Sequence, residues 1–282
     1  MVVESLLTPF SARKRPGKAM LLGMLFATLG VFLGLWIFED HVSLVMVFLT
    51  VTAGIPLFYQ TMIEEEEKDL IYTKERTLLA EHGKTLTFLM MYFIGATVAY
   101  VFLYVVMPTE LSTKVFEVQT QTITSLNQHV TGNAIQIGLL NKIFMNNVKV
   151  MIFCILFAFI YGAGALFILT WNASVIGAAM GNFIKSHIAE YANVFGFQKA
   201  GAYFYVASLS LLRYSLHGIP EILAYFVAAM AGGILSASVI KHDVGTKNFE
   251  RILLDASDLV LLSIFILFIA ALIEVFVTPQ FF

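Results

Sequence analysis

The sequence predicts an all-α, polytopic membrane protein with six or seven transmembrane helices. Of its 282 residues, 59% are hydrophobic and 13% are charged, a balance that water-soluble globules of this size do not have. The apolar residues gather in runs of roughly 20, the length that crosses a hydrocarbon core of about 30 Å. Four basic residues shortly precede or open the first run. We therefore expect a multi-pass protein of the cell membrane whose N-terminus is cytoplasmic.

The N-terminal unit, residues 1–85, is predicted to be a helical hairpin followed by an amphipathic helix. Apolar runs over 19–38 and 42–63 are separated by a short polar turn. Four consecutive glutamates follow at 64–67, and charged residues then surround leucine and isoleucine over 70–79. We expect the glutamates to form a solvated charged face. We expect 70–79 to be a cytoplasmic amphipathic helix on the membrane or against another subunit.

The middle unit, residues 86–147, is predicted to hold a third span and helices at the outer membrane interface. Residues 86–107 carry no charge, and the chain then turns polar over 109–147. The apolar residues of this polar segment recur at a spacing closer to helical than to alternating. About forty residues are too few to bury much of a core of their own. One or two interfacial helices are therefore expected, and not a folded ectodomain.

The C-terminal unit, residues 148–282, is predicted to be the membrane core. Three spans are expected, over 148–170, 219–240 and 256–277. The fourth run is expected to break at Trp171–Ser174. The next stretch, 173–187, is short for a crossing, so it is either a true span or a re-entrant segment. Whether 173–187 is a span or a re-entrant segment, the division of Lys and Arg between the two sides of the membrane is the same. The positive-inside rule therefore leaves the side of the C-terminus open. Glu274, near the end of the last span, is expected to snorkel to the interface.

Small residues indicate where helices pack closely. Two stripes recur at four-residue intervals, and a Gly-x-Gly lies in the fourth run: Ala173, Gly177 and Gly181; Ala228, Gly232 and Ser236; Gly162 and Gly164. Such stripes let helix backbones approach each other in lipid. We expect the two stripes to bring their segments together.

Polar residues at membrane depth are the candidate functional site: Asn146, Asn147, Asn172, His217 and Glu221. They are costly in a bilayer unless they face protein or water. His217 and Glu221 are four residues apart, a spacing that suits proton exchange or cation binding on one helix face. Pro220 and Glu221 also fit an ordinary helix start, with the asparagines as caps. In either case we expect Glu221 to accept a hydrogen bond, with His217 or an asparagine as its partner.

Several function classes find no support in the sequence. The net charge is -2 and no long basic run is present, so nucleic acid is not a predicted partner. The single cysteine, Cys154, is expected to be a small buried hydrophobe. The motifs HExxH, GxSxG and GxxxxGK are missing from the sequence, so we predict no metal and no cofactor, and an enzyme is disfavoured.

The order of motifs over about 146–240 resembles the stage II sporulation protein M family. An asparagine pair precedes a span with Gly-x-Gly inside it, NASVIG follows, and HGIPE heads a small-residue helix. The family usually has Asn-Gly where this chain has Asn172-Ala173. The acidic connection at Glu64 and the sparse charge resemble the archaeal branch of the family. The resemblance implies a polytopic membrane protein that anchors other proteins and has no known chemistry of its own.

Two functions from different classes are therefore expected to compete. The first is a membrane scaffold or anchor that contacts the lipid bilayer and a membrane or cell-envelope protein, as a homodimer. The alternative is a transporter or channel whose pathway is lined by the five polar residues of the candidate site. A polar cavity reaching Glu221 favours transport, whereas a dry core of small residues favours the scaffold.

Overall fold

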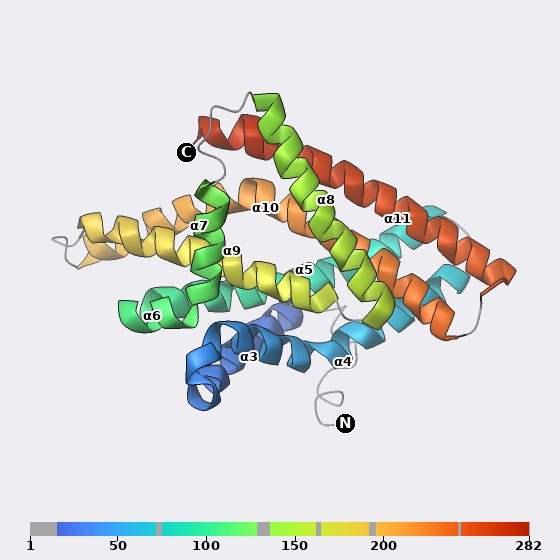
Figure 1. Cartoon of the computed structure of the whole chain (residues 1–282), viewed down its shortest axis with the longest axis horizontal. Helices are drawn as coiled ribbons and strands as arrows, with labels where there is room; N and C mark the ends of the chain where they lie inside the picture. The colour runs from blue at the N-terminus through green and yellow to red at the C-terminus, as the bar shows by residue number, and fades with distance from the viewer. Residues whose placement is uncertain are drawn as a thin grey trace.

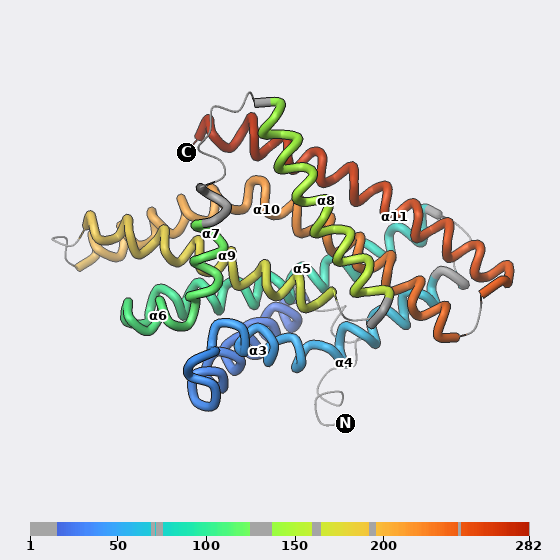
Figure 2. Tube along the Cα trace, in the orientation of Figure 1, coloured from blue at the N-terminus to red at the C-terminus, as the bar shows by residue number. Residues whose placement is uncertain are grey.

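The computed structural model describes residues 16–71, 75–128, 136–161, 165–191, 196–241 and 244–281, and helices dominate these ranges (Figures 1 and 2). Nine α-helices lie in the described residues: α3 (Pro16–Ile37), α4 (Val42–Ile71), α5 (Glu75–Val106), α6 (Thr109–Val115), α7 (Glu117–Gln128), α8 (Gln136–Tyr161), α9 (Ala165–Ile188), α10 (Phe197–Ile240) and α11 (Lys247–Leu272). The short turns are η1 (Glu39–His41), η2 (Ala189–Tyr191), the π-helical η3 (Ile273–Val277) and η4 (Thr278–Gln280).

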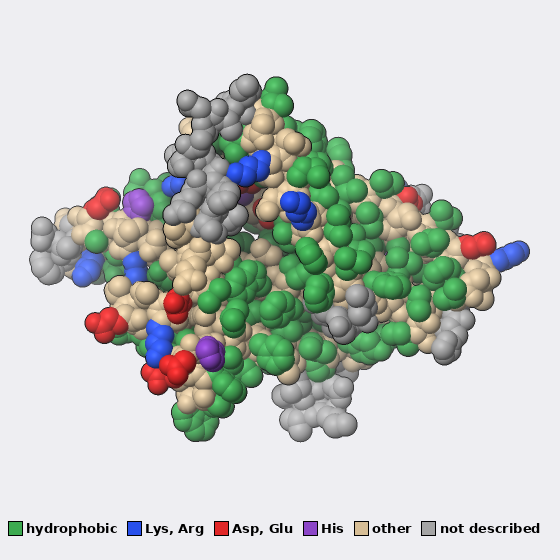
Figure 3. Space-filling view, viewed as in Figure 1, with side chains coloured by type: hydrophobic (Ala, Val, Ile, Leu, Met, Phe, Trp, Pro, Cys, Tyr) green, Lys and Arg blue, Asp and Glu red, His purple; other side chains and the backbone are tan. Residues whose placement is uncertain are grey.

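Seven of these helices are long and apolar enough to cross a membrane: α3, α4, α5, α8, α9, α10 and α11. Hydrophobic side chains cover much of the middle of the molecule in Figure 3, and most charged ones lie toward its two ends. The predicted all-α polytopic membrane fold is confirmed. The stretch 173–187 belongs to α9, whose 24 residues measure about 36 Å at 1.5 Å per residue. It is therefore part of a full-length helix, and the re-entrant model does not fit.

The run predicted as one span over 148–170 is divided between two helices. α8 ends at Tyr161 and α9 begins at Ala165. Gly162 and Gly164, predicted as packing positions, lie between the two helices and outside the described residues.

The break expected at Trp171–Ser174 is not there, because this stretch lies inside α9. The Asn172 amide donates to the Ile168 carbonyl at 2.9 Å, and the Ser174 hydroxyl donates to the Trp171 carbonyl at 2.7 Å. Both polar side chains are thus satisfied by their own helix. They can lie at membrane depth without interrupting it.

The separate amphipathic helix expected over 70–79 is also replaced by longer membrane helices. α4 continues through the glutamates to Ile71, and α5 begins at Glu75. Both helices therefore extend beyond their apolar runs. The charged residues of these extensions pair with one another and with α10 and α11, as described below, and this pairing keeps them helical.

Helix α10 is the longest and does not begin at the HGIPE motif. It starts at Phe197 and runs for 44 residues with Pro220 in its interior, a length of about 66 Å. Proline has no N–H to donate and crowds the carbonyl four residues before it, which bends a helix. Figure 2 shows α10 as an arch. The helix start predicted at this motif is therefore wrong, and the motif lies within the bent helix.

The C-terminal half of α10 forms the centre of the bundle. α10 contacts α4, α5, α8, α9 and α11, and every residue from Ala224 to Ile234 is buried. A Cβ built on Gly232 would lie 2.5 Å from the Ile155 carbonyl oxygen of α8, and one on Gly233 would lie 2.6 Å from Met62 of α4. The glycines therefore let two neighbouring helices approach α10 closely.

The two small-residue stripes face other helices and not each other. On α9, a Cβ at Gly177 would lie 2.5 Å from Tyr100, and one at Gly181 would lie 2.6 Å from Tyr104. Both tyrosines belong to α5, whereas the Gly232 stripe faces α8. The bulky tyrosines fit over the α9 glycines because no side chain competes for the space. Ala173, Ala228 and Ser236 are buried as well.

Two short helices, α6 and α7, follow α5, and α7 crosses in front of α9 in Figure 1. Gln119 of α7 is fully buried. Its amide donates to the Ser43 carbonyl at 2.9 Å and to the Ser174 hydroxyl at 3.2 Å. One side chain therefore ties α7 to both α4 and α9.

Candidate functional site

Polar side chains gather where the C-terminal turns η3 and η4 pack against the bend of α10. We call them the Glu221 cluster, which comprises His217, Glu221, Tyr225, Glu274 and Thr278. Glu274 lies in η3, a single π-helical turn. Such turns are rare and recur at functional sites.

The hydroxyl of Tyr225 donates a hydrogen bond of 2.7 Å to Glu221 Oε1. Their spacing of four residues places both on one face of α10. His217 instead approaches Thr278, with 3.3 Å between Nδ1 and Oγ1. Glu221 therefore has a polar partner, but this partner is the tyrosine and not the histidine or an asparagine. Glu274 interacts electrostatically with Glu221 and Tyr225, so it belongs to the cluster and is not simply an interfacial side chain.

Of the three asparagines, Asn147 of α8 is buried, whereas Asn146 beside it is exposed. The Asn147 amide nitrogen has no hydrogen-bond partner in the described part of the chain. The Asn172 amide donates to a carbonyl of its own helix, α9.

The Glu221 cluster can hold a proton. Two carboxylates that repel each other in an apolar setting are unfavourable when both are charged. A proton on one of them removes this cost, and the Tyr225 hydroxyl stabilises the Glu221 oxygen that it contacts.

A second group of charged residues lies where the extensions of α4 and α5 meet α10 and α11. We call it the ionic cluster: Glu65, Glu66, Lys68, His82, Thr85, Lys241 and Asp255. Glu65 and Glu66 are both fully buried, so the expectation that all four glutamates form a solvated face is wrong. Only part of the stretch faces outward, and Glu67 is exposed.

Glu65 is the centre of the ionic cluster. Its Oε1 accepts from Lys68 Nζ at 2.6 Å and from the Thr85 hydroxyl at 2.6 Å. Its Oε2 lies 2.9 Å from His82 Nδ1, while His82 Nε2 lies 3.2 Å from Asp255 Oδ2. An imidazolium donates from both ring nitrogens, so a protonated His82 links α4 and α11 through α5.

Glu66 makes the link between α4 and α10. Its Oε2 accepts from Lys241 Nζ at 2.5 Å, and its Oε1 has no partner in the described residues. Burial lowers the pKa of Lys241, but the hydrogen bond to Glu66 and the charges of Glu66 and Glu67 outweigh burial and hold that pKa above its ordinary value. Lys241 therefore stays charged beside a buried carboxylate.

Metal ligation is not indicated in either cluster: in the part of the chain that the structure describes, no three His, Cys, Asp or Glu side chains are arranged to hold a metal ion.

Comparison with known proteins places most of this architecture in one family. The family model "SpoIIM: Stage II sporulation protein M" matches residues 84–279. This range begins two residues after His82 and includes the whole Glu221 cluster. No curated protein and no solved structure matches the chain. The match covers more than half of the chain and contains α6 to α11 with most of α5. The chain belongs to the stage II sporulation protein M family.

Proposed function

We propose that this protein is an integral membrane scaffold that holds partner proteins at the membrane. The closed interior of the bundle is the observation that carries this function. The buried stretch from Ala224 to Ile234 fills the centre, and Gly232 and Gly233 bring α8 and α4 close to it. A transport pathway has to open through this centre, whereas a scaffold needs it to stay packed. Membership in the family supports the same reading.

The ionic cluster supports a scaffold in a second way. It joins four helices beyond their apolar runs, so the described helix ends form one connected platform. Side chains on the platform face outward, with Glu67 57% and Lys84 63% exposed. Exposed charges on such a platform suit recognition of a protein partner, because they select its orientation and speed its encounter.

Cross-linking in membranes followed by purification and mass spectrometry tests the scaffold. We expect a stoichiometric protein partner, and we expect native mass spectrometry to show a homodimer of this chain. The double substitution Glu67→Gln with Lys84→Gln should weaken binding of the partner and lower the melting temperature only slightly, because exposed ion pairs contribute about 0–1 kcal/mol. A monomer without a protein partner, both in mild detergent and in nanodiscs, contradicts the proposal.

The proposed scaffold lies in the cell membrane with its N-terminus in the cytoplasm. Basic residues at Arg13, Lys14, Arg15 and Lys18 favour this orientation, and seven crossings then place the C-terminus on the other side. The single cysteine, Cys154, is buried. We replace it with serine and add one cysteine at either the N-terminus or the C-terminus, so that only the added cysteine can be labelled. A membrane-impermeant maleimide should label the C-terminal cysteine in intact cells and the N-terminal one only after lysis. The reverse pattern contradicts this orientation.

The Glu221 cluster favours a transporter or channel as the second candidate function, because it places ionisable groups at membrane depth. Its pathway would use Asn147, His217 and Glu221, while the exposed Asn146 and the internally bonded Asn172 lie apart from them. Proton or cation flux through reconstituted vesicles is the direct measurement.

Substitution of Glu221 separates the two functions. Glu221→Gln keeps an oxygen that accepts from Tyr225, so we expect only a small loss of stability. Glu221→Leu leaves the buried Tyr225 hydroxyl without an acceptor, which costs about 1–3 kcal/mol, and its melting temperature should be clearly lower. Equal melting temperatures for the two variants contradict the structural role of the hydrogen bond. Loss of ion flux in a normally folded Glu221→Gln protein would favour transport over the scaffold.

A further inference from the structure

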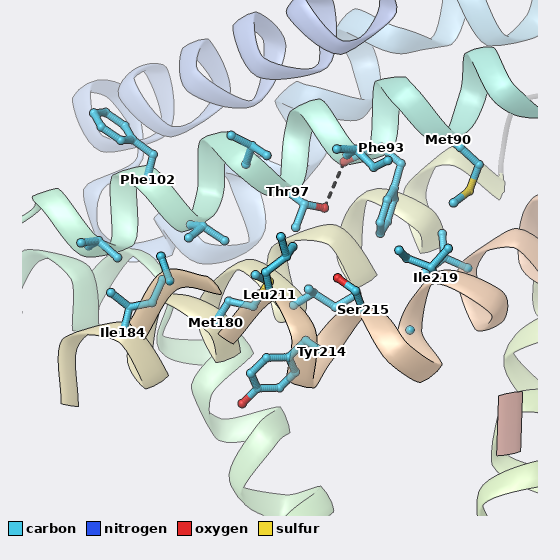
Figure 4. Close-up of a pocket in the computed structure, with 18 of the residues that line it drawn as sticks. Met90, Phe93, Thr97, Phe102, Met180, Ile184, Leu211, Tyr214, Ser215 and Ile219 are labelled. Atoms are coloured by element: carbon cyan, nitrogen blue, oxygen red, sulfur yellow. Dashed lines mark hydrogen bonds between the residues drawn. The ribbon is translucent and has the colours of Figure 1, made fainter. Parts of the chain in front are cut away.

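An apolar groove with a volume of about 520 Å³ lies between α5, α9 and the N-terminal half of α10 (Figure 4). Its walls are almost entirely hydrocarbon, from Met90 and Phe102 on α5 to Leu211 and Ile219 on α10. Of the hydroxyls nearby, that of Thr97 donates to a backbone carbonyl of its own helix at 3.0 Å. The groove therefore offers contact to hydrocarbon and little to a polar ligand.

The groove exists because α10 bends and because one of its residues has no side chain. Met180 of α9 accepts a bond from Ser210 through its carbonyl at 3.4 Å, so the N-terminal half of α10 is held against α9. The helix then turns at Pro220. Gly218 lines the groove next to this bend, and a Cβ built there would meet nothing within 4 Å. The space beside Gly218 is therefore open.

The size of the groove fits one hydrocarbon chain. A cavity of about 150 Å³ binds benzene, or about 25 Å³ for each carbon, so 520 Å³ corresponds to about 20 carbons. A membrane-spanning helix is about 10 Å wide and about 30 Å long, with a volume of about 2000 Å³. The groove is too small for such a helix. Its walls belong to membrane-spanning candidates, so the bilayer itself supplies the chain.

Two cations lie near the end of the groove marked by Val105 and Ile184, although neither lines it. The guanidinium carbon of Arg213 lies 5.5 Å from the centre of the ring of Phe183, the residue before Ile184. Lys185 Nζ lies 5.3 Å from the centre of the Tyr104 ring and donates to the Met107 carbonyl at 2.7 Å and to the Ser112 hydroxyl at 2.8 Å. Cations near the end of an apolar groove attract a phosphate headgroup.

We propose that this groove binds one hydrocarbon chain of a bilayer phospholipid, with the phosphate at the Val105–Ile184 end. The bound lipid fills the space between α5 and the bent α10 and stays with the protein after extraction from the membrane. This site is distinct from the Glu221 cluster and does not depend on the scaffold function.

Filling the groove tests the proposal. Gly218→Leu places a side chain in the open space, whereas Gly201→Leu, on the same helix, adds a side chain that also meets nothing within 4 Å but lies outside the groove. Each protein is exchanged into detergent micelles with palmitoyl-oleoyl phosphatidylglycerol, and native mass spectrometry counts the bound lipids. We expect one retained lipid on the wild type and on Gly201→Leu. Its affinity for Gly218→Leu should be at least about tenfold lower, or about 1.4 kcal/mol.

A second groove-filling variant, Ala207→Leu, should also lose the lipid. It tests the same proposal if Gly218→Leu fails to fold. Arg213→Gln should keep a chain but lose the preference for phosphatidylglycerol over phosphatidylcholine. Equal lipid retention by Gly218→Leu and Gly201→Leu overturns the proposal. So does a change from dimer to monomer in Gly218→Leu at constant lipid count, because a second copy of the chain would then occupy the groove.

Discussion

Replacing Gly95 with leucine is expected to separate α3 from α5 and to leave little folded protein in detergent. A Cβ at Gly95 would lie 2.0 Å from the Met20 carbonyl oxygen, and one at Gly23 would lie 2.0 Å from the Tyr92 carbonyl oxygen. Backbone atoms cannot rotate away as side chains do, so the two helices must move apart. Overpacking costs about 1–3 kcal/mol in cores that can adjust, and we expect the loss here to exceed that range.

The measurement is a thermal unfolding scan in detergent, together with the fraction of protein that elutes as a single species. Gly138→Leu is the matched control, because Gly138 is also helical and a Cβ there would meet nothing within 4 Å. A Gly95→Leu protein that melts at the temperature of this control would show that α3 and α5 are not packed at backbone distance.

The second large effect is expected for His82→Leu in the ionic cluster. His82 is 2% exposed and joins Glu65 to Asp255, and the Glu65 side chain is fully buried. Leucine removes the ring that joins Glu65 Oε2 to Asp255, while Lys68 and Thr85 still contact Glu65 Oε1, and each buried polar atom left unpaired costs about 1–3 kcal/mol. The loss should appear as a lower melting temperature and as easier proteolysis of the α4 and α5 extensions.

Lys84→Leu serves as the control for the histidine variant. Lys84 pairs with Glu81, but its side chain is 63% exposed, and exposed pairs contribute about 0–1 kcal/mol. If His82→Leu and Lys84→Leu lose the same stability, the histidine is not a buried link between the helices.

Hydropathy alone was enough to predict the all-α membrane fold, because every crossing helix needs about 20 apolar residues. The helix boundaries were harder to predict. Asn172 and Ser174 resemble a break in a sequence, yet they bond to carbonyls of their own helix. Pro220 resembles a first helical turn, yet neighbouring helices stabilise α10 on both sides of the bend. The first error arises because these side chains bond within their own helix, and the second because packing against neighbouring helices overrides a local signal.

The candidate site was predicted in part. His217 and Glu221 are ionisable groups in an apolar run, and this signal made them candidates. The hydrogen bond of Glu221 to Tyr225 follows an i, i+4 spacing and could have been found by checking that face of the helix. The position of Glu274 and Thr278 beside α10 could not be found in this way, because it depends on how the end of the chain folds back onto that helix.

The spacing of residues in the sequence indicates that Glu65 and Glu66 lie on the buried face of α4, although their charge suggests exposure. The buried residues of α4 include Phe58, Thr61 and Met62, which are separated by steps of three residues and then one residue. Glu65 and Glu66 follow at the same alternating steps. This period marks one face of a helix. Four consecutive acidic residues suggest a solvated surface, and only the partners on α5, α10 and α11 make their burial favourable.

The ionic cluster also sets an order for assembly in the membrane. Glu65, Glu66 and His82 are synthesised early, whereas Lys241 and Asp255 come from helices made near the end. Because chains are produced from the N-terminus, the nascent protein holds Glu66 without Lys241 and His82 without Asp255 until α10 and the start of α11 arrive. Closure of the bundle by these last helices then gives Glu66 its cation and completes the contacts of His82. An incomplete chain therefore leaves a buried carboxylate without its ammonium partner, which distinguishes it from the finished molecule before any partner binds.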